Sequence, residues 1–226
     1  MKIGIVNSTD FKKFALSHLQ TITDLDIMIF AFGVTGEADL AKEITGESQI
    51  YSELVLLSLT LDCIVIAAMD TLIYGLKHKS AVIIEDGHII DINDMVHGYD
   101  DEYDLGKGFR VYDTSKGKIG LIIHNDILFP ESSRMLTVCD SDFLITLIDT
   151  SLGRDCMVMV RSSSVSNGIY NICSEPSSSY YCDELGVVQG YSKKDFLELD
   201  INPKKDYLLV KSRRKDKYKE IFSNFL

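Results

Sequence analysis

The sequence predicts an α/β (α+β) domain in which two β-sheets pack face to face and helices cover their outer surfaces. Strand and helix patterns alternate as far as residue 67, and paired strand patterns separated by turn residues follow. Such a mixture of βα units and hairpins is satisfied when each sheet buries one face against the other sheet and the opposite face under helices. The chain has 226 residues, 46% of them hydrophobic, and shows no linker rich in Pro, Gly or Ser. We therefore expect a single domain over residues 1–226, with 202–226 as a C-terminal arm and helix.

The first part of the chain is expected to alternate strands with helices. Residues 10–23 repeat apolar side chains at helical spacing, and Ser8 or Thr9 stands where an N-cap is needed. Gly33 and Gly36 end an apolar run before the next helical pattern begins. The expected elements are strands at 2–7, 26–32 and 63–67 and helices at 10–23 and 37–60.

The second part is expected to add hairpins and a second set of strands. Residues 80–84 and 88–92 flank Glu85-Asp86-Gly87, where Gly supplies the positive φ that a tight hairpin needs. Pro130 suits the first turn of a helix, because the N–H it lacks has no helical partner there. The further expected elements are paired strands at 108–112 and 118–124, helices at 130–139 and 156–166, and strands at 143–148, 170–173, 180–182, 187–189 and 197–200.

The most informative segment, residues 117–134, reads Gly-Lys-Ile-Gly-Leu-Ile-Ile-His-Asn-Asp-Ile-Leu-Phe-Pro-Glu-Ser-Ser-Arg. It resembles the nucleophile segment of the nitrilase, or carbon–nitrogen hydrolase, superfamily, whose members read roughly G-K-I-G-x-x-I-C-Y-D-x-x-F-P-E-x-x-R. The segment Lys-Ser-Ala that opens at residue 79 is similar to the start of the family's strand–hairpin segment, which reads N-S-A. The resemblance covers most of the chain. It implies a four-layer α-β-β-α sandwich of the nitrilase type, commonly associated as a homodimer.

The resemblance also implies a catalytic set, and the chain departs from it at three positions. In the family a Cys attacks an amide or nitrile carbon, a Glu carries the proton and a Lys stabilises the developing negative charge. Here the nucleophile position holds His124, followed by Asn125, and the base position holds Phe32. Alignment on His97 places Met95 at the Lys position, and a shift of one residue places Asp94 there; neither is a cation. The sequence therefore indicates a member that lacks the Glu-Lys-Cys set.

Several residues are candidates for displaced or surviving roles. Glu102 corresponds to the second Glu of the family, which orients the Lys and the substrate. A shifted loop would bring Glu37 to the base position or Lys107 to the cation position, and His124 itself is able to act as a nucleophile or base. His97, His124 and Glu102 suit a metal by residue type, but no spacing motif supports such a site. We expect neither a metal nor another cofactor.

Two functions from different classes follow from this pattern. The first is a catalytically inactive, nitrilase-fold pseudoenzyme that binds a small molecule or associates with a protein. The second is an active amidase-type hydrolase of C–N bonds that uses displaced residues or His124. The expected ligand-binding residues are His124, Glu102, Phe32 and Asn125.

Composition limits the partners and the compartment. The formal net charge is −11, which disfavours binding to nucleic acid, although basic residues gather near the C-terminus. Five Cys occur with no C-x-x-C pair, so a disulfide framework is not expected. The sequence has no apolar run of membrane-spanning length and no signal-peptide pattern at its start. We expect a cytoplasmic protein without nucleic-acid or membrane partners.

Overall fold

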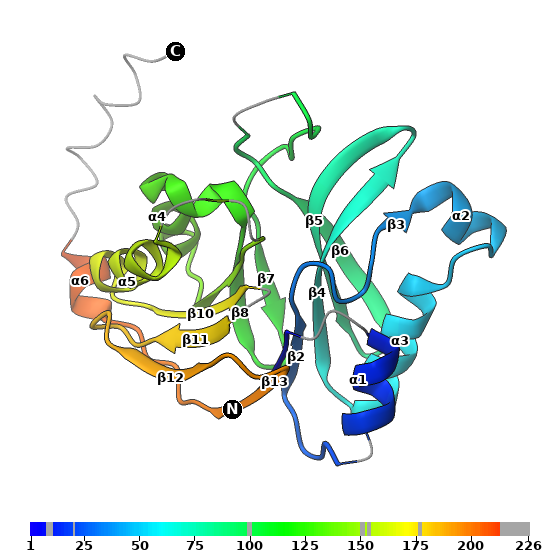
Figure 1. The fold of residues 1–226 in the computed structure, drawn as a ribbon. Helices are drawn as coiled ribbons and strands as arrows, with labels where there is room; N and C mark the ends of the chain where they lie inside the picture. Colours follow the sequence, from blue (N-terminus) through cyan, green and yellow to red (C-terminus); the bar gives the residue numbers. More distant parts are fainter. Residues whose placement is uncertain are drawn as a thin grey trace.

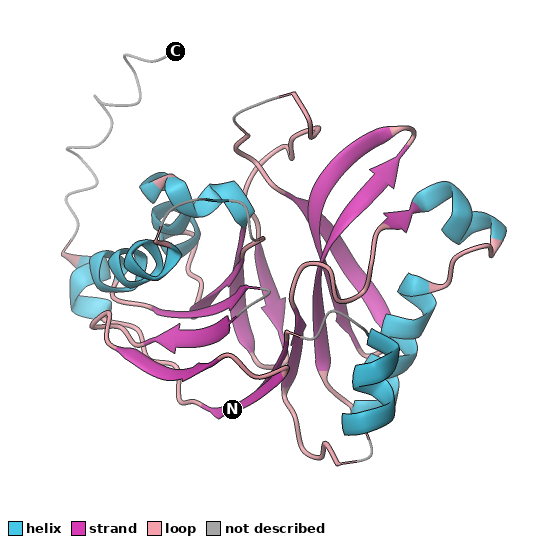
Figure 2. Cartoon of the chain, viewed as in Figure 1, coloured by secondary structure: helices cyan, strands magenta, loops and turns pink. Residues whose placement is uncertain are grey.

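Two β-sheets pack face to face in the computed structural model, and helices lie on both outer surfaces (Figures 1 and 2). The structure describes residues 1–7, 11–19, 21–98, 101–149, 152, 155–175 and 178–212. The predicted four-layer α-β-β-α arrangement is confirmed within these residues.

The first sheet has the strand order β13-β1-β2-β4-β5-β6, with β3 paired to β4. Strands β1, β2 and β4 run parallel, whereas β4, β5 and β6 form an antiparallel meander. Its strands are β1 (Lys2–Val6), β2 (Ile27–Phe30), β3 (Ala38–Asp39), β4 (Ile64–Ile73), β5 (Leu76–Glu85), β6 (His88–Asp94) and β13 (Phe196–Asp200).

The second sheet has the order β12-β11-β10-β9-β8-β7. Its parallel centre, β8, β9 and β10, is flanked by antiparallel strands. Its strands are β7 (Val111–Thr114), β8 (Gly117–Ile123), β9 (Phe143–Leu147), β10 (Tyr170–Glu175), β11 (Ser178–Cys182) and β12 (Val188–Ser192).

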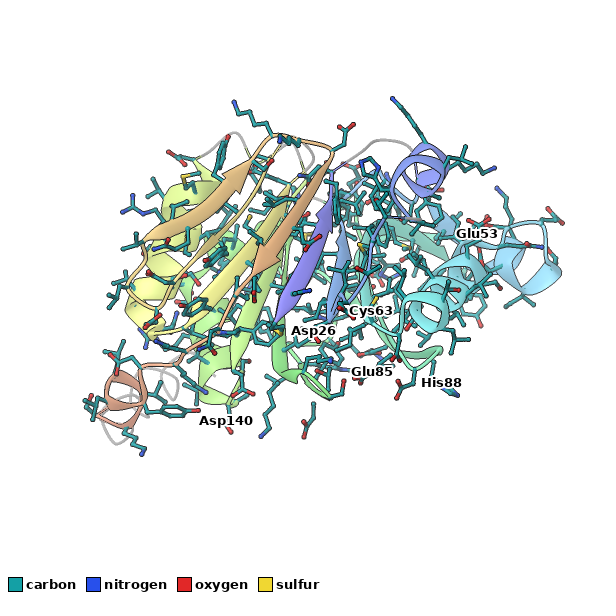
Figure 3. The ribbon with its side chains drawn as sticks, turned by 90° about the horizontal axis from the view of Figure 1, so that it is seen from below. Asp26, Glu53, Cys63, Glu85, His88 and Asp140 are labelled. Atoms are coloured by element: carbon teal, nitrogen blue, oxygen red, sulfur yellow. The ribbon has the colours of Figure 1, made fainter. Side chains whose placement is uncertain are left out.

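Helices cover the two outer faces. On the first sheet lie α1 (Phe11–His18), α2 (Leu40–Thr45) and α3 (Ile50–Leu61), and on the second lie α4 (Pro130–Val138) and α5 (Cys156–Asn167). A short 3₁₀ helix, η1 (His124–Leu128), connects β8 to α4, and α6 (Tyr207–Lys211) follows β13. Seen from below, side chains fill the space between the two sheets (Figure 3). Each sheet thus buries apolar side chains on both faces, which gives one central core and two outer cores.

The β5–β6 hairpin and the start of α4 confirm two local predictions. Asp86 and Gly87 both have positive φ at the β5–β6 turn, and Pro130 occupies the first turn of α4. The prediction of one long helix over residues 37–60 was wrong. Asp39 caps α2, and Gly46 ends it in the left-handed conformation, with φ of +77°. The predicted helix is therefore divided into α2 and α3, because a glycine at this position stops a helix without steric cost.

The ends of the predicted elements differ in smaller ways. The helix expected at 10–23 is described as Phe11–His18, and its expected caps, Ser8 and Thr9, lie outside the described residues, as does 213–226 of the C-terminal arm. Strand β4 extends to Ile73, six residues beyond the predicted strand end at 67, because it pairs along its whole length with β5. In the part of the chain that the structure describes, no helix is long and apolar enough to cross a membrane.

Candidate active site

The candidate site forms at the end of β8, where the chain turns sharply into η1. His124 takes φ of +47° at this turn, a left-handed conformation that costs energy for a residue other than Gly. The turn is held by Asp126, whose buried carboxylate accepts hydrogen bonds from the backbone N–H of Val96 and of His97. His97 also approaches Asp126 with its Nδ1 at 2.9 Å and stacks on Phe129. The loop after β6 is thus fixed against the turn, which sets the position of His124.

His124 is a neutral hydrogen-bond donor in this arrangement. Its side chain is buried, with 5% of the residue exposed, and the backbone N–H of Asp149 donates to its Nδ1 across 3.3 Å. Burial, together with the nearby charge of Lys79, lowers the pKa of His124 to about 4. Because Nδ1 accepts a hydrogen bond, the single ring proton of the neutral form lies on Nε2. Nε2 therefore has no lone pair with which to attack a carbon or accept a proton.

A buried cation, Lys79, lies beside His124. Only 4% of Lys79 is exposed, and its Nζ lies 2.7 Å from Asp149 Oδ2 and 3.1 Å from Asp70 Oδ1. Burial alone would lower the pKa of Lys79, but the two carboxylates raise it. Lys79 is therefore charged at neutral pH, and two carboxylates offset that charge.

Two aromatic rings enclose the Lys79 ammonium. Its Nζ lies 4.9 Å from the ring centre of Phe32 and 4.7 Å from that of Tyr103. The Phe32 ring also meets the ring of His124 edge to face, with 6.4 Å between centres. Cation–π contacts of this kind stabilise a partly desolvated ammonium. Phe32 thus places an apolar side chain between the turn at His124 and the Lys79 ammonium.

We call this group of residues the elbow cluster: Phe32, Asp70, Lys79, Tyr103, His124 and Asp149. The outer edge of the elbow cluster is also charged. Lys77 Nζ lies 3.5 Å from Asp70 and 3.6 Å from Glu102, and the Tyr103 hydroxyl donates to Asp70 at 3.4 Å. Glu102 is mostly exposed and reaches the cluster through Lys77. Charges of both signs therefore alternate from the solvent inward to Lys79.

Comparison with known proteins assigns the chain to a family. A family model described as carbon-nitrogen hydrolase matches residues 37–191. The chain belongs to the carbon–nitrogen hydrolase family. Comparison with curated proteins gives no match.

Solved structures with the same fold include several members of this family, all of low identity to the chain. A carbon-nitrogen hydrolase from Helicobacter pylori G27 has a TM-score of 0.72 at 17% identity, covering 98% of both chains. Saccharomyces cerevisiae Nit3, of the nitrilase superfamily, has a TM-score of 0.74 at 16% identity, covering 98% of this chain and 93% of Nit3. A mutant amidase from Nesterenkonia sp. AN1, whose active-site cysteine carries a covalently added acetamide moiety, has a TM-score of 0.74 at 15% identity, covering 100% of this chain and 97% of the amidase.

In this member of the carbon–nitrogen hydrolase family the structure gathers some of the expected site residues. Phe32 and His124 contact each other, and Met95 is buried with Phe32 in the central core, its backbone N–H donating to the carbonyl of Lys79. Asn125 follows His124 in η1 and is half-buried. Glu102 lies at the outer edge of the cluster.

Other candidates lie elsewhere in this family member. Glu37 is exposed before β3, and Lys107 lines a cavity on the outer side of the first sheet. The Nδ1 atom of His97 already makes a hydrogen bond with Asp126. Among the described residues, no group of three His, Cys, Asp or Glu side chains is placed to hold a metal ion.

The thiols lie outside the central core. Cys63 lies in the outer core of the first sheet, beside Asp26 (Figure 3). Cys156, Cys173 and Cys182 lie in the outer core of the second sheet. Cys139 is exposed after α4. All five cysteines are described, and the central core, which contains Phe32 and Met95, includes none of them.

Three residues of the site, Lys79, Asp70 and Asp149, were not predicted from the sequence. Lys79 opens the segment that corresponds to the family's N-S-A, and a lysine in an otherwise buried strand is an unusual feature that would have identified it. Asp149 comes from a chain segment 70 residues away in sequence, so no local pattern links it to Lys79.

Proposed function

We propose that this carbon–nitrogen hydrolase family member is a catalytically inactive pseudoenzyme whose elbow cluster binds a small polar molecule. The observation that carries the proposal is the hydrogen bond from the Asp149 backbone to His124 Nδ1. It leaves the residue at the nucleophile position with a proton on Nε2, and so without a nucleophilic atom.

The base and the cation of the family reaction are also replaced. Phe32 stands at the base position, and a phenyl ring transfers no proton. Met95 stands at the Lys position. Lys79 supplies a positive charge nearby, but Asp149 and Asp70 already offset it at 2.7 and 3.1 Å. An oxyanion formed beside Lys79 would also meet the repulsion of those two carboxylates, which raises the energy of the transition state.

The same features suit binding. His124 Nε2–H is a donor, Asp149 and Asp70 carry acceptor oxygens, and the buried Phe32 and Met95 make the inner side of the cluster apolar. A few convergent polar groups on an apolar wall are typical of small-molecule sites. Asn125 and Glu102, beside His124 and at the edge of the cluster, are expected to add polar contacts.

We further propose that the protein is a homodimer through α4 and α5. Four apolar side chains on these helices are about half exposed: Met135, Val138, Val158 and Val165. The two helices are joined by hydrogen bonds from Arg134 to the Ser166 carbonyl and from Asn167 to Ser133 Oγ. A rigid apolar face of this kind is costly to leave in water and suits a symmetric interface.

Turnover assays test the absence of activity. Purified full-length protein should release no ammonia above background from acetamide, propionamide and short nitriles. The His124→Cys variant should remain inactive, because Phe32 and Met95 still supply neither base nor cation. Turnover by the wild type that disappears in His124→Ala would overturn the pseudoenzyme proposal.

The second candidate function is an active amidase-type hydrolase that uses displaced residues. The position of Lys79 favours this function. The Lys79 ammonium lies close to His124 and pairs with Asp149, whose backbone N–H donates to His124. In this case Asp149 would activate a water and Lys79 would stabilise the oxyanion. Turnover lost equally in Lys79→Met and Asp149→Asn but kept in His124→Asn would support the second function against the first.

A further inference from the structure

A second polar site lies on the opposite face of the first sheet from the elbow cluster. Side chains alternate along β5, so Lys79 faces the central core while His78 and Ser80 face outward. His78 lines a cavity of about 280 Å³. The other lining residues are Ile92, Asn93, Asp94, Asp104, Leu105, Gly106, Lys107, Gly108 and Arg110.

One lining residue of this cavity, Asp94, is held by a buried hydrogen-bond chain. Ser80 Oγ donates to Asp94 Oδ1 at 2.6 Å, and Ser80 Oγ lies 2.7 Å from Thr71 Oγ1. Since the Ser80 proton is used on Asp94, Thr71 must donate to Ser80. Thr71 and Ser80 are both fully buried. The chain fixes one oxygen of Asp94 and turns the other, Oδ2, toward His78.

His78 lies between two carboxylates without a hydrogen bond to either. Its Nδ1 is 3.5 Å from Asp94 Oδ2, and its Nε2 is 3.9 Å from Asp104 Oδ2. Only 9% of the His78 side chain is exposed, and Nδ1 is a buried atom with no hydrogen-bond partner. Buried polar groups are usually hydrogen-bonded, so this imidazole and its two carboxylates form an incompletely satisfied polar wall.

The loop that carries Asp104 is held in place by the sheet. The backbone N–H of Asp104 donates to the Lys77 carbonyl at 2.8 Å, and that of Gly106 donates to the Met95 carbonyl at 2.8 Å. Any side chain at Gly106 would place its Cβ 2.5 Å from the Asp94 carbonyl oxygen, so only glycine lets the loop pass this closely. The wall of the cavity is therefore preformed.

The lining carries two carboxylates and two cations, but the charges nearest His78 are the two carboxylates and favour a cation. Arg110 is already paired with Asp91 at 2.6 Å, so its charge is offset outside the His78 wall. Lys107 is exposed at the loop. Asp94 and Asp104 bracket His78, and a donor group between them would gain charge-assisted hydrogen bonds. We propose that this cavity binds a small organic cation carrying a primary ammonium group, with Asp94 and Asp104 as acceptors and His78 against it.

The experiment uses the full-length protein and 1,3-diaminopropane as the probe. Isothermal titration calorimetry at pH 7.5 should show saturable binding, and the melting temperature should rise with the probe concentration. Propane-1,3-diol has a similar shape without charge and should not bind. Imidazole NMR signals of His78, assigned by their loss in His78→Gln, should shift on addition of the diamine.

Variants separate this site from general attraction to an acidic protein. Asp104→Asn should raise the Kd for the diamine by about tenfold or more, as expected for loss of a charged hydrogen bond. Asp113→Asn makes the same charge change on an exposed residue of β7 outside the cavity and should leave the Kd unchanged. Lys107→Gln should leave binding unchanged or tighten it.

Four results obtained with organic ligands alone would overturn the proposal. They are no saturable diamine binding, equal weakening by Asp113→Asn, no shift of the His78 signals, and binding of propionate that Lys107→Gln abolishes. The last result would assign the cavity to anions. Displacement of the diamine by one equivalent of Mg²⁺ would assign it to a metal ion, and this too would contradict the proposal.

Discussion

The backbone N–H of Asp149 donates a hydrogen bond to Nδ1 of His124, and the side chain of the same Asp149 pairs with Lys79 at 2.7 Å. Asp149, which follows β9, therefore fixes both the tautomer of the His124 imidazole and the position of the Lys79 ammonium. Phe32 fills the space beside both. The backbone turn at His124 is thus surrounded by a network of charge pairs and ring contacts.

The first prediction concerns the titration of His124. Its pKa is lowered from an ordinary 6.5 to about 4 by burial and by Lys79. The unfolded chain therefore binds more protons than the folded chain between these two values, and the free energy of unfolding falls as pH falls through that window. Between pH 7 and pH 4.5 this loss is about 2 to 3 kcal/mol.

Urea unfolding of the wild type and of His124→Asn at both pH values measures this loss. Asn tolerates the positive φ at position 124 and does not titrate in this range, so the variant should lose less stability by about 2 kcal/mol. The pKa of His124 from NMR gives a direct check. An imidazole that titrates near 6.5, or an equal loss of stability in both proteins, would contradict the prediction.

The second prediction concerns Lys79→Met. The change leaves two carboxylates, Asp70 and Asp149, without their shared cation. Because these carboxylates are 25% and 29% exposed, water offsets part of the penalty, and we expect a loss of about 2 kcal/mol rather than the full cost of breaking a buried pair. The pKa of His124 should rise in this variant, since Lys79 lowers it and the two carboxylates raise it.

Lys77→Met is the matched control. Lys77 contacts Asp70 as well but is more exposed, so its loss should cost less than about 1 kcal/mol. Urea unfolding and NMR titration measure the two effects separately. If both variants lost the same stability and left the His124 pKa unchanged, Lys79 would not be the central charge of the cluster.

Some local signals in the sequence were sufficient to predict parts of the fold. Gly87 and Pro130 fixed the β5–β6 turn and the start of α4, because their backbone preferences are local. Phe32 and His124, which the family resemblance assigned to one site, lie with their rings in contact. By contrast, the break between α2 and α3 depends on Gly46 and on the cap at Asp39, and an apolar periodicity continuing on either side concealed it.

The site itself was harder to predict for a physical reason. The charge of Lys79 is retained in a buried position only because Asp70 and Asp149 meet it, and these residues come from β4 and from the segment after β9. The protonation of His124 depends on a backbone N–H from the same segment. Pairings of this kind are set by the packing of the two sheets, and no spacing in the sequence records them.

The third prediction concerns thiol reactivity. Four cysteines are buried and one, Cys139, is exposed. Burial raises the pKa of Cys63 to about 12 and those of Cys156 and Cys182 to about 11, which suppresses the reactive thiolate. Ellman's reagent should therefore label one thiol per native chain and five after denaturation. In Cys139→Ser native labelling should be lost, and rapid labelling that persists in this variant would show that a second thiol is accessible.

The last prediction concerns the proposed homodimer. Val158 on α5 is 57% exposed, and in a symmetric interface each substitution occurs twice and places like charges near each other. Wild-type protein should sediment at twice the chain mass of 25.4 kDa, and Val158→Lys should sediment as a monomer. Leu56→Lys is the control, because Leu56 is 63% exposed on α3, in the opposite outer layer. If Leu56→Lys dissociates the dimer and Val158→Lys does not, the chain associates through the helices of the first sheet. If the wild type sediments as a monomer at concentrations of tens of micromolar, the exposed apolar face of α4 and α5 must serve a different partner.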